Sequence, residues 1–328
     1  MQDRDAAGRI RRRSCDRTTM GNTDIFRIQG VAMTTTISAK TVAELRQRTG
    51  AGMMDCKKAL EETNGDMDAA VEYLRKKGMA KADKRADRST SEGVVGGQIL
   101  NDGASGVLVE VACETDFVAR NEDFQKFAAT LVEQMVASKA TDAESFLSEP
   151  LKSDSSRTVA EFVKETSAKT GEAVNVKRVA RLDAGDKGLV GMYRHHNGKL
   201  GTLVQVSAPS AEVARHEATR ELVKYIAEHV AASAQTIAVD RTGVSADKLE
   251  SERRVAEGQA REAGKPDAMI DKIATGKVEA FLKDVTLLPQ PWVRDNALTI
   301  AQLIAEHGKR AGGAVTVEKF ARIQLGAE

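Results

Sequence analysis

An internal repeat constrains the fold of this chain more than any other feature. Segments 93–112 and 188–208 carry glycine at matched positions with a constant spacing of 95 residues, and each ends in a run in which apolar and polar residues alternate. The matched pairs are Gly93 and Gly188, Gly96 and Gly191, Gly103 and Gly198, and Gly106 and Gly201. Period-two alternation around an Asn/Asp/Gly turn predicts a β-hairpin in each copy. An amphipathic helix follows each copy, so we expect two related α+β subdomains, each an antiparallel sheet with helices on one face.

Residues 37–80 predict a small three-helix domain ahead of the repeat. Turns that contain glycine separate three short segments with helical apolar periodicity. Either Ser38 or Thr41 can cap the first helix, and we expect the third to stop at Gly78, because glycine commonly follows the last turn of a helix. The charged segment 81–92 has almost no large apolar residue and is expected to be a linker or an exposed helix.

A helical hairpin is expected between residues 245 and 285. Its apolar positions are Leu249, Val255 or Ala256, Ala260 and Ala263 before a Gly-Lys-Pro-Asp turn, and Met269, Ile270, Ile273, Val278, Phe281, Leu282 and Val285 after it. Two apolar stripes with polar outer faces predict a hairpin that projects as an antiparallel coiled coil. We therefore expect subdomains at 93–187 and 188–328, with the hairpin inserted in the second.

Residues 1–36 are expected to be a disordered leader. They contain an Arg run with interspersed acids and no apolar periodicity, and those acids do not fit an organelle transit peptide. We interpret Met33 as the true start of translation. The alternative is that the Arg run is a nucleic-acid or targeting patch.

Charge and cysteine content argue against several classes of protein. The 49 Lys and Arg residues nearly balance the 48 Asp and Glu residues, so the phosphate backbone of nucleic acid is not expected as the main partner. The three cysteines are far apart and predict neither a disulfide framework nor a metal-binding pair, which fits a reducing cytoplasm. No apolar stretch approaches the ~18 to 20 residues needed to cross a bilayer.

Motifs for catalysis are missing from the sequence. It has no P-loop, GxSxG or HExxH pattern. His195 and His196 are neighbours in the chain, and adjacent side chains rarely bind the same metal ion. We therefore expect no catalytic residue, no cofactor and no metal, and a protein that acts by binding rather than as an enzyme.

The segment 113–121 joins a buried-type strand to a helix and allows two interpretations. In the first, Asp116 or Asn121 caps the helix and Phe117 packs in the local core. In the second, Phe117 beside the carboxylate of Asp116 anchors the chain in a pocket of a partner protein. The residues alone do not decide between them.

Two long strings resemble the signature segments of the elongation factor Ts family. They are TGAGMMDCKKAL at 49–60, followed by NGD, and ETDFVARN at 114–121, with supporting similarity in HVAAS at 229–233 and in the GKP and QPW motifs. The resemblance covers about Ile37 to the C-terminus. It implies a ubiquitin-associated-like N-terminal domain, a core of two related subdomains and a coiled-coil protrusion.

The resemblance also implies a function and a set of contacts. Members of the family bind elongation factor Tu, a GTPase, and accelerate GDP release so that GTP can load. The implied partner-binding residues are Leu45, Met53, Met54, Thr115, Asp116, Phe117, Val118 and His195. Asp116 and Phe117 would approach the magnesium and switch region of the GTPase, and His195 the helix after its phosphate loop. The alternative function is a ubiquitin-associated-like adaptor without exchange activity.

Two features depart from the family pattern. Several members have an additional C-terminal helix that touches the partner, whereas this sequence ends at Glu328, so we expect that contact to be missing. The neighbouring His196 leaves the active histidine ambiguous by one position, although the spacing from Tyr193 and Arg194 favours His195. The expected assembly is a heterodimer with the GTPase, or a higher assembly of it, in the cytoplasm.

Overall fold

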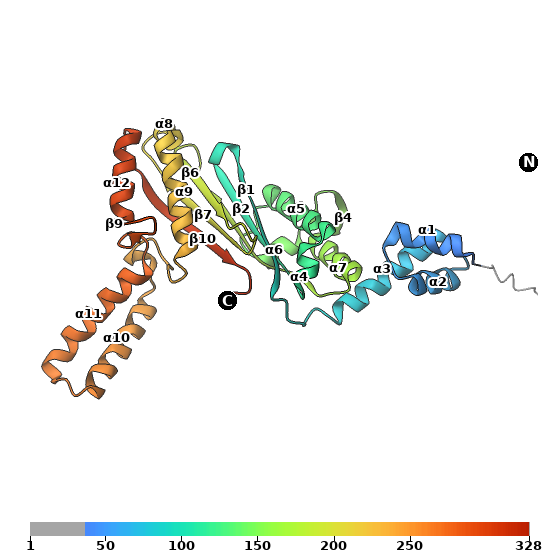
Figure 1. The fold of residues 1–328 in the computed structure, drawn as a ribbon, viewed down its shortest axis with the longest axis horizontal. Coiled ribbons are helices and arrows are strands. Elements are labelled where there is room, and N and C mark those ends of the chain that lie inside the picture. The colour runs from blue at the N-terminus through green and yellow to red at the C-terminus, as the bar shows by residue number, and fades with distance from the viewer. Residues whose placement is uncertain (1–36, 328) are drawn as a thin grey trace, which may run out of the picture.

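The computed structural model describes residues 37–327 of the 328. The expected leader at 1–36, together with the proposed start at Met33, lies outside the described residues. Figure 1 shows an elongated molecule with three helices at one end, two sheets in the middle and a helical hairpin at the other end. The predicted α+β class with antiparallel sheets is confirmed. No helix between residues 37 and 327 is long and apolar enough to cross a membrane.

The N-terminal helices form a small bundle. They are α1 (Ala39–Thr49), α2 (Met53–Glu62) and α3 (Met67–Asp83). Of the two possible caps, Ser38 caps α1, because its hydroxyl accepts the Thr41 N–H. Leu45, Cys56 and Leu60 are fully buried and form the centre of the bundle core.

The third helix continues past the residue at which it was expected to stop. The predicted end at Gly78 is wrong, because α3 runs on to Asp83. Gly78 lies against α7 (Val159–Thr170), where an added Cβ would come within 2.9 Å of the Ala168 Cβ. This glycine therefore permits close packing of two helices instead of ending one. Two ion pairs also join these helices, Arg75 with Glu165 and Asp83 with Lys164.

The first subdomain is an antiparallel sheet in the order β1-β2-β5. Its strands are β1 (Glu92–Leu100), β2 (Ser105–Cys113) and β5 (Val174–Asp183). Its other elements are α4 (Asp116–Arg120), α5 (Glu122–Ala137), α6 (Ala143–Ser148), the paired strands β3 (Pro150–Leu151) and β4 (Asp154–Thr158), and α7. Side chains of β2 alternate, since Val107 and Val109 pack with the helices whereas Leu108 packs with the other sheet.

The second subdomain repeats this arrangement in the order β10-β7-β6. Its strands are β6 (Gly188–Arg194), β7 (Leu200–Ser207) and β10 (Thr316–Gln324). Its other elements are α8 (Ala211–Arg215), α9 (Glu217–Ala232), the paired strands β8 (Pro291–Trp292) and β9 (Asp295–Thr299), and α12 (Ile300–Ala311). In β7, Val204 and Val206 pack with α9 and α12, whereas Leu203 packs with the first sheet.

The structural repeat extends further along the chain than the matched glycines. After the β-hairpin and the helices that follow it, each subdomain continues with a pair of short strands, a helix and the last strand of its sheet. Thr158 and Thr299 begin α7 and α12 with the same type of capping box, and Gly171 and Gly312 follow these helices at φ values of 78° and 82°. The matched glycines do not reveal this part of the repeat, because the inserted hairpin changes the spacing between the copies.

The two sheets pack face to face and the helices cover their outer faces, giving four layers (Figure 1). Val95 and Leu108 of the first sheet meet Leu203 of the second in a shared cluster. A Cβ on Gly106 would lie 2.9 Å from Leu203, and one on Gly201 would lie 2.9 Å from Leu108. The repeated glycines therefore allow the two sheets to approach each other closely.

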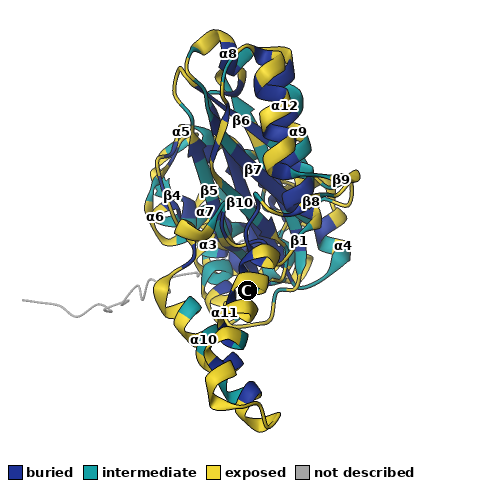
Figure 2. Cartoon of the chain, turned by 90° about the vertical axis from the view of Figure 1, so that its left-hand side faces the viewer, coloured by how far each residue is buried: buried dark blue, intermediate teal, exposed yellow. Residues whose placement is uncertain are grey.

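The hairpin consists of α10 (Ala246–Glu262) and α11 (Asp267–Val285) and projects from the second subdomain (Figures 1 and 2). Its buried positions are Ala256, Ala260, Ile270, Ala274, Val278, Leu282 and Val285. Of the two alternatives in α10, Ala256 is thus the inward residue. The expected places of Ala263 and Met269 in the seam are wrong, because both residues are exposed.

Candidate partner-binding surface

The turn after β2 presents an apolar ring to solvent. Thr115 caps the short helix α4, with its hydroxyl accepting the Val118 N–H, whereas Asn121 caps the next helix, α5. Phe117 is 83% exposed, which rules out the interpretation that it packs in the local core. Asp116 beside it is half-buried and pairs with Arg120 at 3.0 Å.

Hydrogen bonds from a distant loop hold the backbone of this turn. The Glu172 carboxylate accepts the N–H groups of Glu114 and Thr115 at 3.1 and 3.0 Å and the Thr115 hydroxyl at 2.6 Å. In return, the Glu114 carboxylate accepts the Ala173 N–H at 2.6 Å. The hydrogen bond from this N–H lowers the pKa of Glu114, and the nearby Arg88 lowers it further. Glu172 was not predicted from the sequence, because no local pattern links residues so far apart.

The histidine pair lies at the end of β6. The His195 ring is half-buried and its Nδ1 lies 2.8 Å from the Tyr193 hydroxyl. His196 is exposed and packs against His195, with ring centroids 4.2 Å apart and ring planes tilted by 51°. The turn that follows joins the first sheet, since Val95 donates its N–H to the Gly198 carbonyl at 2.7 Å.

A cavity of about 500 Å³ brings the two regions together. Asp116 and Arg120 line it from α4, and Arg194, His196 and Lys199 line it from the β6–β7 hairpin. Its walls therefore come from both subdomains, and five of its twelve lining residues carry a charge. The structure places Thr115, Asp116, Phe117 and Val118 on one short segment, with His196 across this cavity. His195 is not among the residues that line the cavity.

The candidates in the three-helix bundle divide by burial. Met53 and Met54, at the first turn of α2, are 43% and 77% exposed. Leu45 is fully buried, so the structure places it in the bundle core and not on a contact surface. A Met pair at an exposed bend suits an adaptable contact, because its side chains are flexible and polarizable.

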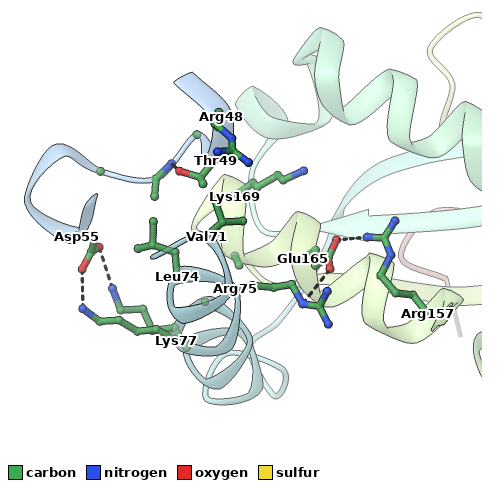
Figure 3. A pocket seen from close by; sticks show the side chains of 16 residues that line it. Arg48, Thr49, Asp55, Val71, Leu74, Arg75, Lys77, Arg157, Glu165 and Lys169 are labelled. Carbon is green, nitrogen blue, oxygen red and sulfur yellow. Dashed lines mark hydrogen bonds and ion pairs between the residues drawn. The ribbon is translucent and has the colours of Figure 1, made fainter. Parts of the chain in front are cut away.

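A second cavity, of about 340 Å³, lies between the bundle and α7 (Figure 3). Asp55 pairs there with Lys77 and Lys81 at 2.9 and 3.2 Å, and these lysines lower its pKa. Glu165 pairs with Arg157 at 2.6 Å. Most charges of this cavity are thus paired with one another, and Met53 and Met54 are not among its lining residues.

Among residues 37–327, no group of three or more His, Cys, Asp or Glu side chains is placed to hold a metal ion. Burial, together with the nearby charge of Glu172, raises the pKa of the Cys113 thiol to about 12. This thiol is therefore not a nucleophile at neutral pH.

Comparison with known proteins identifies similar chains. The family described as "Elongation factor TS" matches residues 114–327. The chain is 43% identical over 294 residues to "Elongation factor Ts" of Lawsonia intracellularis. The aligned residues make up 89% of this chain and 99% of the relative. It is 42% identical to the protein of the same name from Trichlorobacter lovleyi, and the alignment covers 88% of this chain and 93% of that relative. It is also 42% identical to the protein of the same name from Prosthecochloris aestuarii, with 89% of this chain and 99% of that relative covered.

Proposed function

The chain belongs to the elongation factor Ts family, and from this membership we infer that it acts as the guanine nucleotide exchange factor of elongation factor Tu. It promotes GDP release and allows GTP loading during translation elongation. The adaptor without exchange activity is not favoured, because the relatives cover nearly the whole chain and not the three-helix bundle alone.

Exchange of this kind requires a negative coupling between two ligands of the GTPase. The factor binds the nucleotide-free GTPase more tightly than the GDP-bound form, and by reciprocity it weakens GDP binding by the same factor. No covalent bond is made or broken in this process. The factor therefore needs a preformed contact surface and no catalytic group, and we propose that it is not itself an enzyme.

The exposed ring of Phe117 is the observation that carries the proposed contact. A large apolar side chain held in solvent beside Asp116 is suited to insert into a pocket of the partner. We place Thr115 and Val118 in the same contact, and His195, whose ring packs against the cavity-lining His196, in a second one. Asp116 and Phe117 approach the magnesium and switch region, and His195 approaches the helix after the phosphate loop of the GTPase.

The remaining parts of the chain extend this surface. We propose that the three-helix bundle is of the ubiquitin-associated-like type and touches the GTPase through Met53 and Met54, with Leu45 supporting them from the core. We also propose that the hairpin α10–α11 is an antiparallel coiled coil. The complex is a cytoplasmic heterodimer with the GTPase, and the nearly balanced charge speaks against direct nucleic-acid binding.

Release of a fluorescent GDP analogue tests the proposed function. Elongation factor Tu loaded with the analogue is mixed with excess unlabelled GDP, with and without this protein. We expect the release rate to rise with the concentration of this protein and then to saturate. An unchanged release rate at saturating concentrations, with both proteins folded, would remove the exchange function.

A further inference from the structure

We propose that Glu172 is a positioning residue for nucleotide exchange, because its carboxylate holds the turn that presents Phe117. This inference rests on the proposed function and adds to it a residue outside the expected contact segment. Glu172 lies between α7 and β5, more than fifty residues along the chain from the turn that it holds.

One carboxylate accepts three hydrogen bonds at this place. Oε2 accepts the N–H groups of Glu114 and Thr115, and Oε1 accepts the Thr115 hydroxyl. The same hydroxyl accepts the Val118 N–H at 3.4 Å. Glu172 is therefore connected directly to the residue that caps α4, and the orientation of that helix depends on the cap.

Glu172 is itself held in place by its own loop. The Ser167 hydroxyl donates to the Glu172 carbonyl at 2.5 Å, and the Thr170 hydroxyl accepts the Glu172 N–H at 3.4 Å. Gly171 turns the chain out of α7 in the left-handed region. The Ala173 N–H then binds Glu114, so that the two segments hold each other in both directions.

Helix α4 needs such support because it has only five residues. A helix of this length is not stable alone, since each new helix must first form a costly nucleus. Its far end is held by Gln125, whose side-chain amide donates to the Ala119 carbonyl at 2.6 Å. Glu172 holds the near end, so the exposed ring of Phe117 stands on a short segment fixed at both ends.

Fixing this segment before binding favours association. Ordering a mobile loop at an interface reduces affinity, and a preorganised contact avoids most of this cost. Without the carboxylate, water replaces the three hydrogen bonds and the turn samples other orientations of Phe117. The expected loss therefore appears in binding and exchange, while the two sheets and their cores stay intact.

Two substitutions at Glu172 separate hydrogen bonding from charge. Glu172→Ala is expected to reduce the second-order exchange rate about tenfold, equal to ~1.4 kcal/mol, with no comparable fall in melting temperature. Glu172→Gln keeps an oxygen for the two N–H groups and an amide that can donate to Thr115, so we expect it to stay within about twofold of the native rate. A Gln variant as slow as the Ala variant would overturn the hydrogen-bonding role.

A matched control comes from another carboxylate of the same subdomain. Glu149 accepts hydrogen bonds from Ser138 and Gln134 at the opposite end of α5. Glu149→Gln should leave the exchange rate of the folded protein unchanged. Hydrogen–deuterium exchange provides a structural readout, because the amides of Glu114 and Thr115 should lose protection in Glu172→Ala and keep it in the control. Retained protection there would contradict the proposal.

The Phe117→Ala background tests whether Glu172 acts through the ring. If it does, Glu172→Ala causes little further loss once the ring is absent, because the two effects are not additive. A full additional tenfold loss would overturn the positioning role. Failure of the proposed function is a separate result, since the native protein would then not accelerate GDP release at all. Thr115→Val, which replaces the hydroxyl that bonds to Glu172 by a methyl group, is used instead if Glu172→Ala does not fold. A native exchange rate in Thr115→Val would contradict the proposal.

Discussion

At the scale of single residues, burial separates side chains of the same type. Phe117 and Phe124 lie seven positions apart, yet Phe117 is 83% exposed whereas Phe124 is almost completely buried in the core of the first subdomain. Exposure of a large ring is unfavourable in the free protein, because apolar surface remains in contact with water. Such a ring is therefore suited to binding, whereas Phe124 is suited to stability.

Phe117→Ala should impair exchange without unfolding the protein. We expect GDP release to slow by about 30-fold, equal to ~2 kcal/mol, as is typical of an interface hot spot. Because the ring makes few contacts in the free protein, the melting temperature should hardly move. The release assay and a thermal melt on the same sample measure both effects.

The matched control is Phe124→Ala. Its buried ring should cost about 3 to 5 kcal/mol of unfolding free energy, while each folded molecule keeps its exchange activity. If Phe117→Ala instead lowered the melting temperature strongly and left the activity of the folded fraction normal, the contact assigned to Phe117 would be wrong.

His229 links the end of α9 to the chain that returns from the hairpin. Its Nδ1 accepts the Val293 N–H at 3.3 Å, so its Nε2 carries the proton and donates to Gln290 at 2.9 Å. Both bonds suit the neutral ring. Burial lowers the pKa of His229, and the hydrogen bond to Gln290 only partly opposes this effect.

The depressed pKa of His229 predicts a stability that depends on pH. In the unfolded chain, His229 has the ordinary His pKa of ~6.5. Between that pH and the lower pKa of the folded state, the unfolded chain therefore binds more protons than the folded chain. The contribution of His229 is therefore complete above pH ~6.5 and is lost as the pH falls from there through the folded pKa. Urea unfolding between pH 8 and 5 should show this fall for the native protein and a smaller one for His229→Gln. Equal pH slopes for the two proteins would contradict the assignment.

At the scale of elements, the hairpin has a seam of its own and a separate base. Its middle is closed by small and branched residues such as Ala256, Ala274 and Ile270. At the base, Leu282 and Val285 pack with Ala238, which precedes the hairpin. The tip therefore depends on the hairpin alone, whereas the base belongs to the second subdomain.

Shortening the hairpin should leave the rest of the protein folded. We would replace residues 250–277 by a short Gly/Ser loop and keep Leu249 and Val278, which belong to the base cluster. The shortened protein should unfold in one cooperative transition with a free energy within about 1 kcal/mol of the native value, because its removed contacts lie within the removed segment. Loss of cooperativity in circular dichroism melts would show that the tip is part of the core.

At the scale of the whole molecule, two sheets meet through a glycine-lined interface. Gly106 and Gly201 occupy equivalent positions in the two copies, and each faces large side chains of the opposite sheet. The close approach lets Leu108 and Leu203 become fully buried. This packing holds the two subdomains, and with them the two walls of the proposed contact cavity, in one arrangement.

Gly201→Ala should destabilise the protein through this interface. The new methyl group would lie 2.9 Å from the side chains of Leu108 and Val95, so either these buried side chains or the sheets must shift, at a cost of about 1 to 3 kcal/mol. Gly258→Ala in α10 is the control, because no neighbouring atom lies within 4 Å and alanine favours a helix by ~1 kcal/mol. Urea unfolding should give the lowest free energy of unfolding for Gly201→Ala, an intermediate value for the native protein and the highest value for Gly258→Ala. A Gly201→Ala variant of native stability would rule out tight packing of the sheets.

Local patterns in the sequence determined most of the elements and the strand pairing within each β-hairpin of the repeat. Period-two alternation, caps and the repeated glycines are properties of neighbouring residues, so they predicted the β-hairpins, the amphipathic helices and the inserted hairpin. The same patterns located Asp116 and Phe117 where a strand gives way to a helix. They left the role of Phe117 undecided, because the pattern does not say what lies opposite the ring.

Only the tertiary structure decided which surfaces the elements bury and which they leave open. Phe117 remains in solvent and Leu45 does not, Ala256 and not its neighbour Val255 enters the hairpin seam, and Gly78 lies within a helix. Each of these outcomes depends on contacts between segments that are distant in the chain. The bonds from Glu172 to the turn at Thr115 are of the same kind, since the three-dimensional fold brings these residues together and no local signal in the sequence does.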